Sequence, residues 1–132
     1  MPEAKSLLQR HAEYYTKNMG LRVFPCNGKT PATSHGCKDA TTDPAQVAEW
    51  WGGGSTYNVA IATGNGLVVL DVDTNHDAGK FGDETLADLE QQYCPLPETW
   101  TCLTGGGGVH YYFQCDDPAL TVGVEFAPGL DY

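Results

Sequence analysis

Basic residues are scarce in this chain of 132 residues: seven lysines and arginines stand against seventeen acidic residues, which gives a net charge of −10. Affinity for nucleic acid depends largely on Lys and Arg contacts to phosphate, so composition alone argues against a nucleic-acid binder. No apolar run approaches the roughly 18 residues of a membrane span, and the N-terminus lacks the charged and apolar regions of a signal peptide. We therefore expect a soluble, cytoplasmic protein without a membrane partner.

Paired cysteine motifs are also missing. The five cysteines are odd in number and irregularly spaced, and no two form a C-x-x-C pair. In a cytosolic protein this pattern indicates free thiols rather than disulfides. A zinc site drawing on Cys94, Cys102, Cys115 and a histidine is a weaker alternative, because structural zinc sites usually show close ligand pairs.

The length and a hydrophobic fraction of 41% suit a single packed domain over residues 1–132. Periodicity and capping residues predict helices over residues 3–19, from Pro44 through Trp51 after an Asp43 N-cap, and after Asp83, which we expect to cap the third helix. Runs rich in β-branched and aromatic residues predict strands at 21–25 (ended by a proline), 58–62, 67–73, 99–103, 109–115 and 121–126, with a further extended segment from Pro128. Asn65-Gly66 lies between two of these runs and predicts a hairpin that pairs them.

Two carboxylates end the apolar run Leu67–Asp73. Asp71 and Asp73 are two residues apart, so on a strand they would project from the same face. The simpler explanation is a strand end, where Asp commonly begins a turn. The alternative is a divalent-cation site, because Mg²⁺ is usually held by one or two carboxylates together with substrate phosphates.

Four glycines, at 105–108, separate the strands predicted at 99–103 and 109–115, and His110 follows them. This is either a loose hairpin turn with a structural histidine or a place where bare backbone amides let an anion approach. Lys29 and Lys38 lie in a polar stretch from Cys26 to Thr42. It is either a solvated surface loop or an anion-contacting one.

Several segments in collinear order resemble the N-terminal domain of the bifunctional DNA primase/polymerase (prim-pol) family, of the archaeo-eukaryotic primase superfamily. They are Gly36-Cys37-Lys38-Asp39-Ala40-Thr41-Thr42-Asp43-Pro44, Trp50-Trp51, residues 58–64, residues 66–73, Leu96-Pro97-Glu98-Thr99 and residues 104–113. The resemblance implies an α+β fold of the primase/polymerase type, with an N-terminal α/β unit and an RRM-like catalytic sheet. In the family an arginine and a glycine-rich strand usually follow the third motif, so we expect a chain truncated at its C-terminus, after Tyr132.

The resemblance also assigns roles. It implies a catalytic set of Asp71, Asp73, His110 and Asp131, in which the three aspartates bind Mg²⁺ or Mn²⁺ and His110 contacts the phosphates of the incoming nucleotide. With His110, the predicted nucleotide-binding residues are Thr104, Gly106, Gly107, Gly108, Lys29 and Lys38. The implied partners are a single-stranded DNA template and primer, nucleoside triphosphates and a replicative helicase.

We therefore expect a DNA primase/polymerase that synthesises and extends primers in phage- or plasmid-type DNA replication. Leu103 and Val109 stand where the family often has basic residues. Together with the net charge, they leave a second hypothesis: a catalytically inactive remnant that binds only metal or nucleotide. A metal-dependent phosphodiesterase is the third, because two acids and a histidine also serve hydrolysis.

Overall fold

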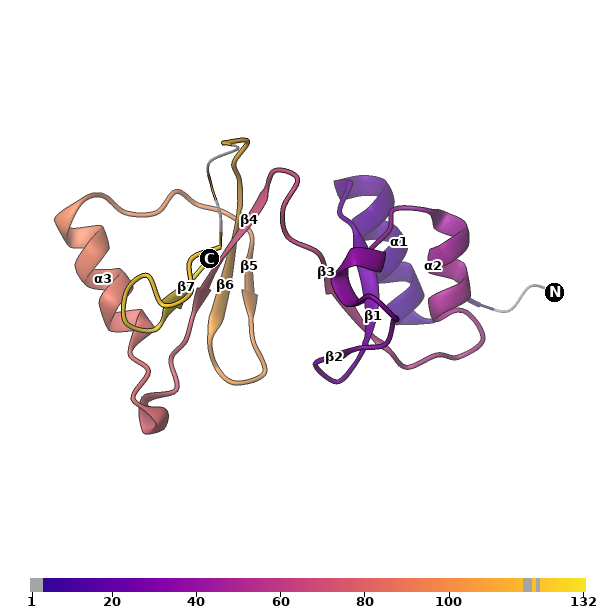
Figure 1. The fold of residues 1–132 in the computed structure, drawn as a ribbon, viewed down its shortest axis with the longest axis horizontal. Coiled ribbons are helices and arrows are strands. Elements are labelled where there is room, and N and C mark those ends of the chain that lie inside the picture. Colours follow the sequence, from indigo (N-terminus) through magenta and orange to yellow (C-terminus); the bar gives the residue numbers. More distant parts are fainter. Residues whose placement is uncertain (1–3, 118–119, 121) are drawn as a thin grey trace. The chain divides into compact units, whose positions relative to one another are not determined.

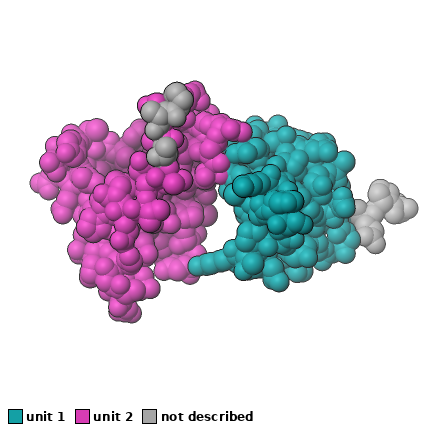
Figure 2. Space-filling view, in the orientation of Figure 1, with its two compact units in different colours: residues 1–62 teal, residues 63–132 magenta. Residues whose placement is uncertain are grey.

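The computed structural model describes residues 4–117, 120 and 122–132, and the chain divides into two compact units, residues 1–62 and residues 63–132 (Figure 2). The described part holds three α-helices and two antiparallel sheets, so the predicted α+β class is confirmed. None of its helices is long and apolar enough to cross a membrane.

Unit 1, residues 1–62, is built on a sheet with strand order β2-β1-β3. Its strands are β1 (Val23–Asn27), β2 (Thr30–Pro31) and β3 (Asn58–Ile61), and a short 3₁₀ turn, η1 (Gly36–Asp39), follows β2. Helices α1 (Leu7–Met19) and α2 (Pro44–Trp51) lie together on one side of this sheet (Figure 1). The fully buried Ala12, Val23, Val47 and Trp51 join both helices to β1 in one core cluster.

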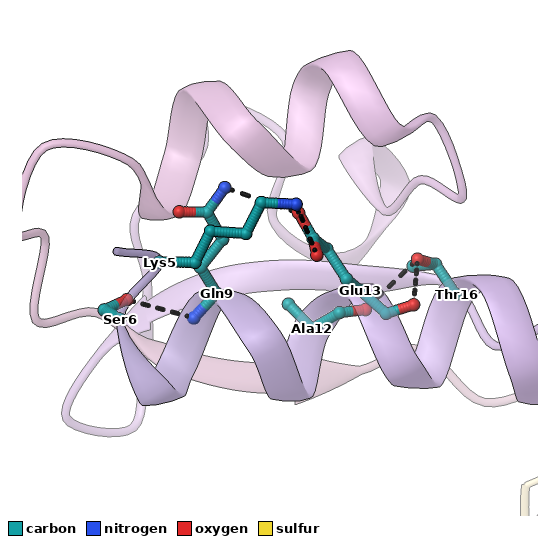
Figure 3. Close-up of polar contacts among 6 residues, drawn as sticks. All are labelled: Lys5, Ser6, Gln9, Ala12, Glu13 and Thr16. Carbon is teal, nitrogen blue, oxygen red and sulfur yellow. Dashed lines mark hydrogen bonds and ion pairs between the residues drawn. The ribbon is translucent and has the colours of Figure 1, made fainter. Parts of the chain in front are cut away.

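Polar contacts fix both the start and the surface of α1 (Figure 3). The Ser6 hydroxyl accepts a hydrogen bond from the backbone N–H of Gln9, which makes Ser6 the N-cap. The prediction of a helix from residue 3 was therefore wrong at residues 4–6, and residue 3 lies outside the described residues. Lys5, which precedes the N-cap, lies 2.9 Å from a Glu13 carboxylate oxygen and lowers the pKa of that carboxyl by donating a hydrogen bond to it.

Helix α2 has the predicted ends, because Asp43 accepts from the Ala45 N–H, Pro44 occupies the first turn and Gly52 is the C-cap. The strand predicted at 21–25 was wrong at both ends, since β1 begins at Val23 and runs through Pro25 to Asn27. The Pro25 carbonyl accepts from Ala32, on the side of the strand away from β3. The proline nitrogen faces the same way, so the missing N–H removes no bond from the β1–β3 ladder.

Unit 2, residues 63–132, is built on a sheet with strand order β5-β6-β4-β7. The strands are β4 (Leu67–Val72), β5 (Thr101–Leu103), β6 (Val109–Gln114) and β7 (Leu130–Asp131). A short 3₁₀ turn, η2 (His76–Ala78), precedes helix α3 (Gly82–Gln92), which packs against β4 and β7 (Figure 1). Val72 and Leu130, which are paired across β4 and β7, are buried.

The predicted hairpin between 58–62 and 67–73 was wrong. A tight turn does form, because Gly64, Asn65 and Gly66 all have positive φ and the Gly64 and Leu67 backbones exchange two hydrogen bonds. The strands then separate: β3 pairs with β1 over four residues, and β4 pairs with β6 over six. The longer ladders outweigh the single bridge that the turn provides.

Two further predictions in unit 2 were wrong. Asp83 does not cap α3, because the helix begins at Gly82 and the Asp83 carboxylate pairs with His76 instead. In the strand predicted at 121–126, residue 121 lies outside the described residues and the rest is not a strand. Residues 124–126 form a turn in which Glu125 has a φ of 43°. The extended segment predicted near the end is present as β7.

Candidate functional site

Strand register places three of the predicted catalytic residues in one row across the second sheet. His110 on β6 pairs with Asp71 on β4, and Asp71 pairs in turn with Asp131 on β7. Cys102 on β5 extends the row on the other side of His110. Side chains directly opposite one another in antiparallel strands lie on the same face, so these four side chains share one surface.

Asp71 and His110 form the centre of this row. Their nearest atoms, Asp71 Oδ1 and His110 Nε2, are 3.4 Å apart, an ion-pair distance when the imidazole is protonated. Both side chains are partly exposed, at 45% for Asp71 and 35% for His110, so a ligand can reach them. The imidazole also meets the Tyr112 ring edge-on, with centroids 6.5 Å apart.

Asp73 lies one residue beyond β4, where three backbone segments converge. Its N–H donates to the Gly129 carbonyl and its own carbonyl accepts from the Gly82 N–H, both at 2.8 Å. A Cβ at Gly82 would lie 2.4 Å from the Gly129 oxygen, so the first turn of α3 and the chain before β7 can approach only through glycine. The Asp73 carboxylate accepts the Asn75 N–H at 3.0 Å, which closes a turn at the strand end.

Asp131 is tied to a lysine that had no predicted role. The Asp131 carboxylate accepts from the backbone N–H of Glu125, and the Glu125 carboxylate pairs with Lys80. The pKa of Lys80 is raised, first by its hydrogen bond to Glu125 and further by the charges of Glu125, Asp73 and Asp131. Lys80 therefore balances part of the negative charge of the predicted aspartates. The signal in the sequence that could have pointed to Lys80 is its position, as a basic residue seven positions after Asp73 in an acidic chain.

The predicted glycine turn is an ordered structure between β5 and β6. Thr104 closes it, because its N–H donates to Gly108 O at 2.9 Å and its hydroxyl accepts from the Gly108 N–H at 2.9 Å. The Thr74 hydroxyl donates to the Gly107 carbonyl at 2.8 Å and ties the turn to the end of β4. The amides of the exposed residues Gly105 and Gly106 have no acceptor among the described residues, which leaves two N–H donors in this turn.

The two predicted lysines belong to unit 1, whereas the other predicted site residues belong to unit 2. Lys29 lies in the two-residue turn between β1 and β2, and Lys38 lies in η1; both are exposed. Their predicted contact with nucleotide stays a prediction.

Carboxylate oxygens are the donors that Mg²⁺ and Mn²⁺ prefer, so Asp71, Asp73 and Asp131 fit such an ion by their chemistry. Across residues 4–117, 120 and 122–132, no three His, Cys, Asp or Glu side chains are close enough together to hold a metal. Nor is there such a group around Cys94, Cys102 and Cys115, the residues of the alternative zinc site, in this described part of the chain. All five cysteines are free thiols. In Asp73 and Asp131 the oxygen that accepts a backbone N–H is Oδ1, which leaves Oδ2 of each for an ion.

Comparison with known families identifies the chain. The family model described as bifunctional DNA primase/polymerase, N-terminal, matches residues 12–131. The chain belongs to this prim-pol family. The match spans both units and includes every predicted site residue from Lys29 to Asp131, which confirms the resemblance. No curated protein and no solved structure matches the chain. Membership in the prim-pol family points to a nucleotidyltransferase-type enzyme of DNA replication that binds DNA and nucleotides.

Proposed function

We propose that this chain is a DNA primase/polymerase catalytic domain that transfers nucleotides to a primer, or starts one on single-stranded DNA, with Mg²⁺ or Mn²⁺. The row of His110, Asp71 and Asp131 across three strands, at one end of a sheet that also carries the glycine turn, carries this proposal. The β5-β6-β4-β7 sheet with α3 would be the RRM-like catalytic sheet, and unit 1 the N-terminal α/β unit. We place the activity in cytoplasmic DNA replication of the phage or plasmid type, with a replicative helicase as partner.

The residues divide the chemistry between them. The open amides of Gly105 and Gly106 and the His110 imidazole would donate hydrogen bonds to phosphate oxygens, where preorganised donors stabilise developing charge. Asp71 would orient the imidazole from the neighbouring strand, since its carboxylate oxygen lies 3.4 Å from His110 Nε2. Asp71, Asp73 and Asp131 would hold the metal, which supplies Lewis-acid stabilisation of the attacking and leaving oxygens when bound.

Primer extension tests this function. With Mn²⁺ or Mg²⁺, deoxynucleotides and a primed template, the chain should extend the primer, and Asp71→Ala should lower the rate by at least about a hundredfold through loss of a metal carboxylate. Asp88→Ala is the matched control, because Asp88 is an exposed acid on α3 and its loss changes the net charge equally.

A second candidate function is nucleotide binding without catalysis. The net charge of −10, together with Leu103 and Val109 beside the glycine turn, favours it, because both reduce the positive charge available to DNA. A folded chain that binds nucleotide and extends no primer with either metal would support this alternative. Release of nucleoside monophosphates without extension would indicate a phosphodiesterase.

A further inference from the structure

The unit 2 sheet has two chemically different faces. Thr99, Thr101 and Tyr111 line a pocket with Glu90 of α3, so these side chains lie on the helix side. Side chains alternate along a strand, so the residues between them lie on the opposite face. That face carries Trp100, Cys102, His110 and Tyr112. The aromatic side chains of this group are therefore on the same surface as Asp71 and His110.

Trp100 and Tyr112 are neighbours on this face. The Tyr112 N–H donates to the Trp100 carbonyl at 3.0 Å, and the Thr99 hydroxyl donates to the Tyr112 carbonyl. Trp100 is 58% exposed, an unusual position for the largest apolar side chain. The backbone bond holds Trp100 and Tyr112 opposite each other at the end of the β5–β6 ladder, and the Thr99 hydroxyl bond secures the Tyr112 carbonyl beside them.

Order along β6 relates these aromatic side chains to the glycine turn. The turn at 105–108 comes first, His110 follows on the same face as Asp71, and Tyr112 is one side-chain repeat further on, about 7 Å away along the strand. A nucleotide has the same linear order of phosphates, sugar and base. If its phosphates lie at the turn and His110, its base extends over Tyr112 and Trp100.

We propose that Trp100 and Tyr112 form a stacking surface for the base of the nucleotide bound at His110, an inference that rests on the proposed nucleotide site. Stacking on aromatic rings contributes to nucleic-acid and nucleotide affinity without reading base identity, because every base has a π face. Stacking also suits the composition of this chain in particular. Seven basic residues offer few phosphate contacts, and stacking is a source of affinity that does not need positive charge.

Binding measurements by calorimetry with Mg²⁺ test the stacking surface, with dATP and inorganic tripolyphosphate as two separate ligands. Trp100→Ala should weaken dATP binding on the order of tenfold, because the base loses the ring on which it stacks. Tripolyphosphate binding should be unchanged, because that ligand has no base. Trp100→Phe keeps an aromatic face and should bind dATP within about threefold of the wild type. It should also abolish the part of the tryptophan fluorescence quenching on dATP binding that comes from this residue.

Tyr93→Ala is the matched control, because Tyr93 is also an exposed aromatic residue of unit 2 (74% exposed) but directly follows α3 and belongs to neither β5 nor β6. It should bind both ligands like the wild type. If Trp100→Ala keeps full dATP affinity while the wild type binds both ligands, the stacking proposal is wrong and the nucleotide site stands. If the wild type binds neither ligand, the nucleotide site fails, and the stacking surface fails with it.

Discussion

His76 and Asp83 form a charge pair just beyond the candidate site. The imidazole Nε2 lies 3.0 Å and 3.2 Å from the two Asp83 oxygens, and the ring stacks on Phe81 with centroids 4.7 Å apart. The hydrogen bond to Asp83 is the largest cause of a raised pKa for His76, and the same bond lowers the pKa of Asp83. The pair fixes the loop that links the end of β4 to α3.

We predict that Asp83→Asn returns the pKa of His76 toward its usual value near 6.5. Because the folded-state pKa is raised, the stabilisation from protonated His76 is fully present below the unfolded pKa and is lost as pH rises through the folded pKa. An NMR titration of the His76 ring protons measures the change. Asp77→Asn is the control with a smaller effect, since Asp77 is the weakest contributor to this shift. A His76 pKa that Asp83→Asn leaves unchanged would contradict the pairing.

Residues such as Lys80 and Trp100 show why single-residue roles were hard to predict. Asp71 and His110 stood out from local patterns, a carboxylate after an apolar strand and a histidine after four glycines. Lys80 acquires its role chiefly through Glu125, forty-five residues away. Trp100 acquires its role only from the β5–β6 register and from its exposure. Such contacts depend on how distant segments pair, and no local spacing encodes them.

The glycine turn between β5 and β6 has positions with different requirements. A Cβ at Gly108 would lie 2.6 Å from the Val72 carbonyl oxygen, which is backbone and cannot move aside easily. A Cβ at Gly106 would meet nothing within 4 Å, and the φ of Gly106 is not positive. The turn therefore needs glycine at Gly108 for close packing against β4, and it does not need glycine at Gly106 for its fold.

We predict that Gly108→Ala lowers the free energy of unfolding by about 1–3 kcal/mol, the usual cost of overpacking. Gly106→Ala should change it by less than about 0.5 kcal/mol, as exposed substitutions generally do. Urea unfolding followed by circular dichroism measures both variants. Equal stability of the two variants would show that the turn does not pack on β4 as described.

The ends of helices and turns could be predicted where neighbouring residues determine them. The pairing partner of each strand could not. Helix α2 has its predicted start and end because Asp43, Pro44 and Gly52 act within one turn. At Asn65 the local conformation also followed from sequence, since the turn has the expected positive φ angles. The partner of each flanking strand did not follow, because β1 and β6 compete for β3 and β4 from distant positions in the chain. Local chemistry specified the turn, and long-range pairing decided the sheets.

At the scale of the whole molecule, the buried apolar residues are unevenly divided. Those of unit 1 are Ala12, Val23, Phe24, Pro25, Cys26, Val47, Trp51 and Ala62. Among the described residues of unit 2, only Val72 and Leu130 are buried to the same degree. All three residues of β5 are exposed. Local stability follows buried apolar contact, so we expect unit 1 to open less readily than unit 2.

Hydrogen exchange on the full chain should therefore show slow amides in α1, β1 and β3, faster ones in β4 and β6, and the fastest strand amides in β5. Trp51→Ala provides the decisive comparison, because Trp51 is fully buried and its truncation should cost about 3–5 kcal/mol. If protection falls only within residues 1–62, the units unfold separately. If it falls equally in both units, residues 1–132 unfold as the single domain predicted from composition. Slower exchange in β5 than in β1 would contradict the argument from buried area, because it would place the stability where the core is thinnest.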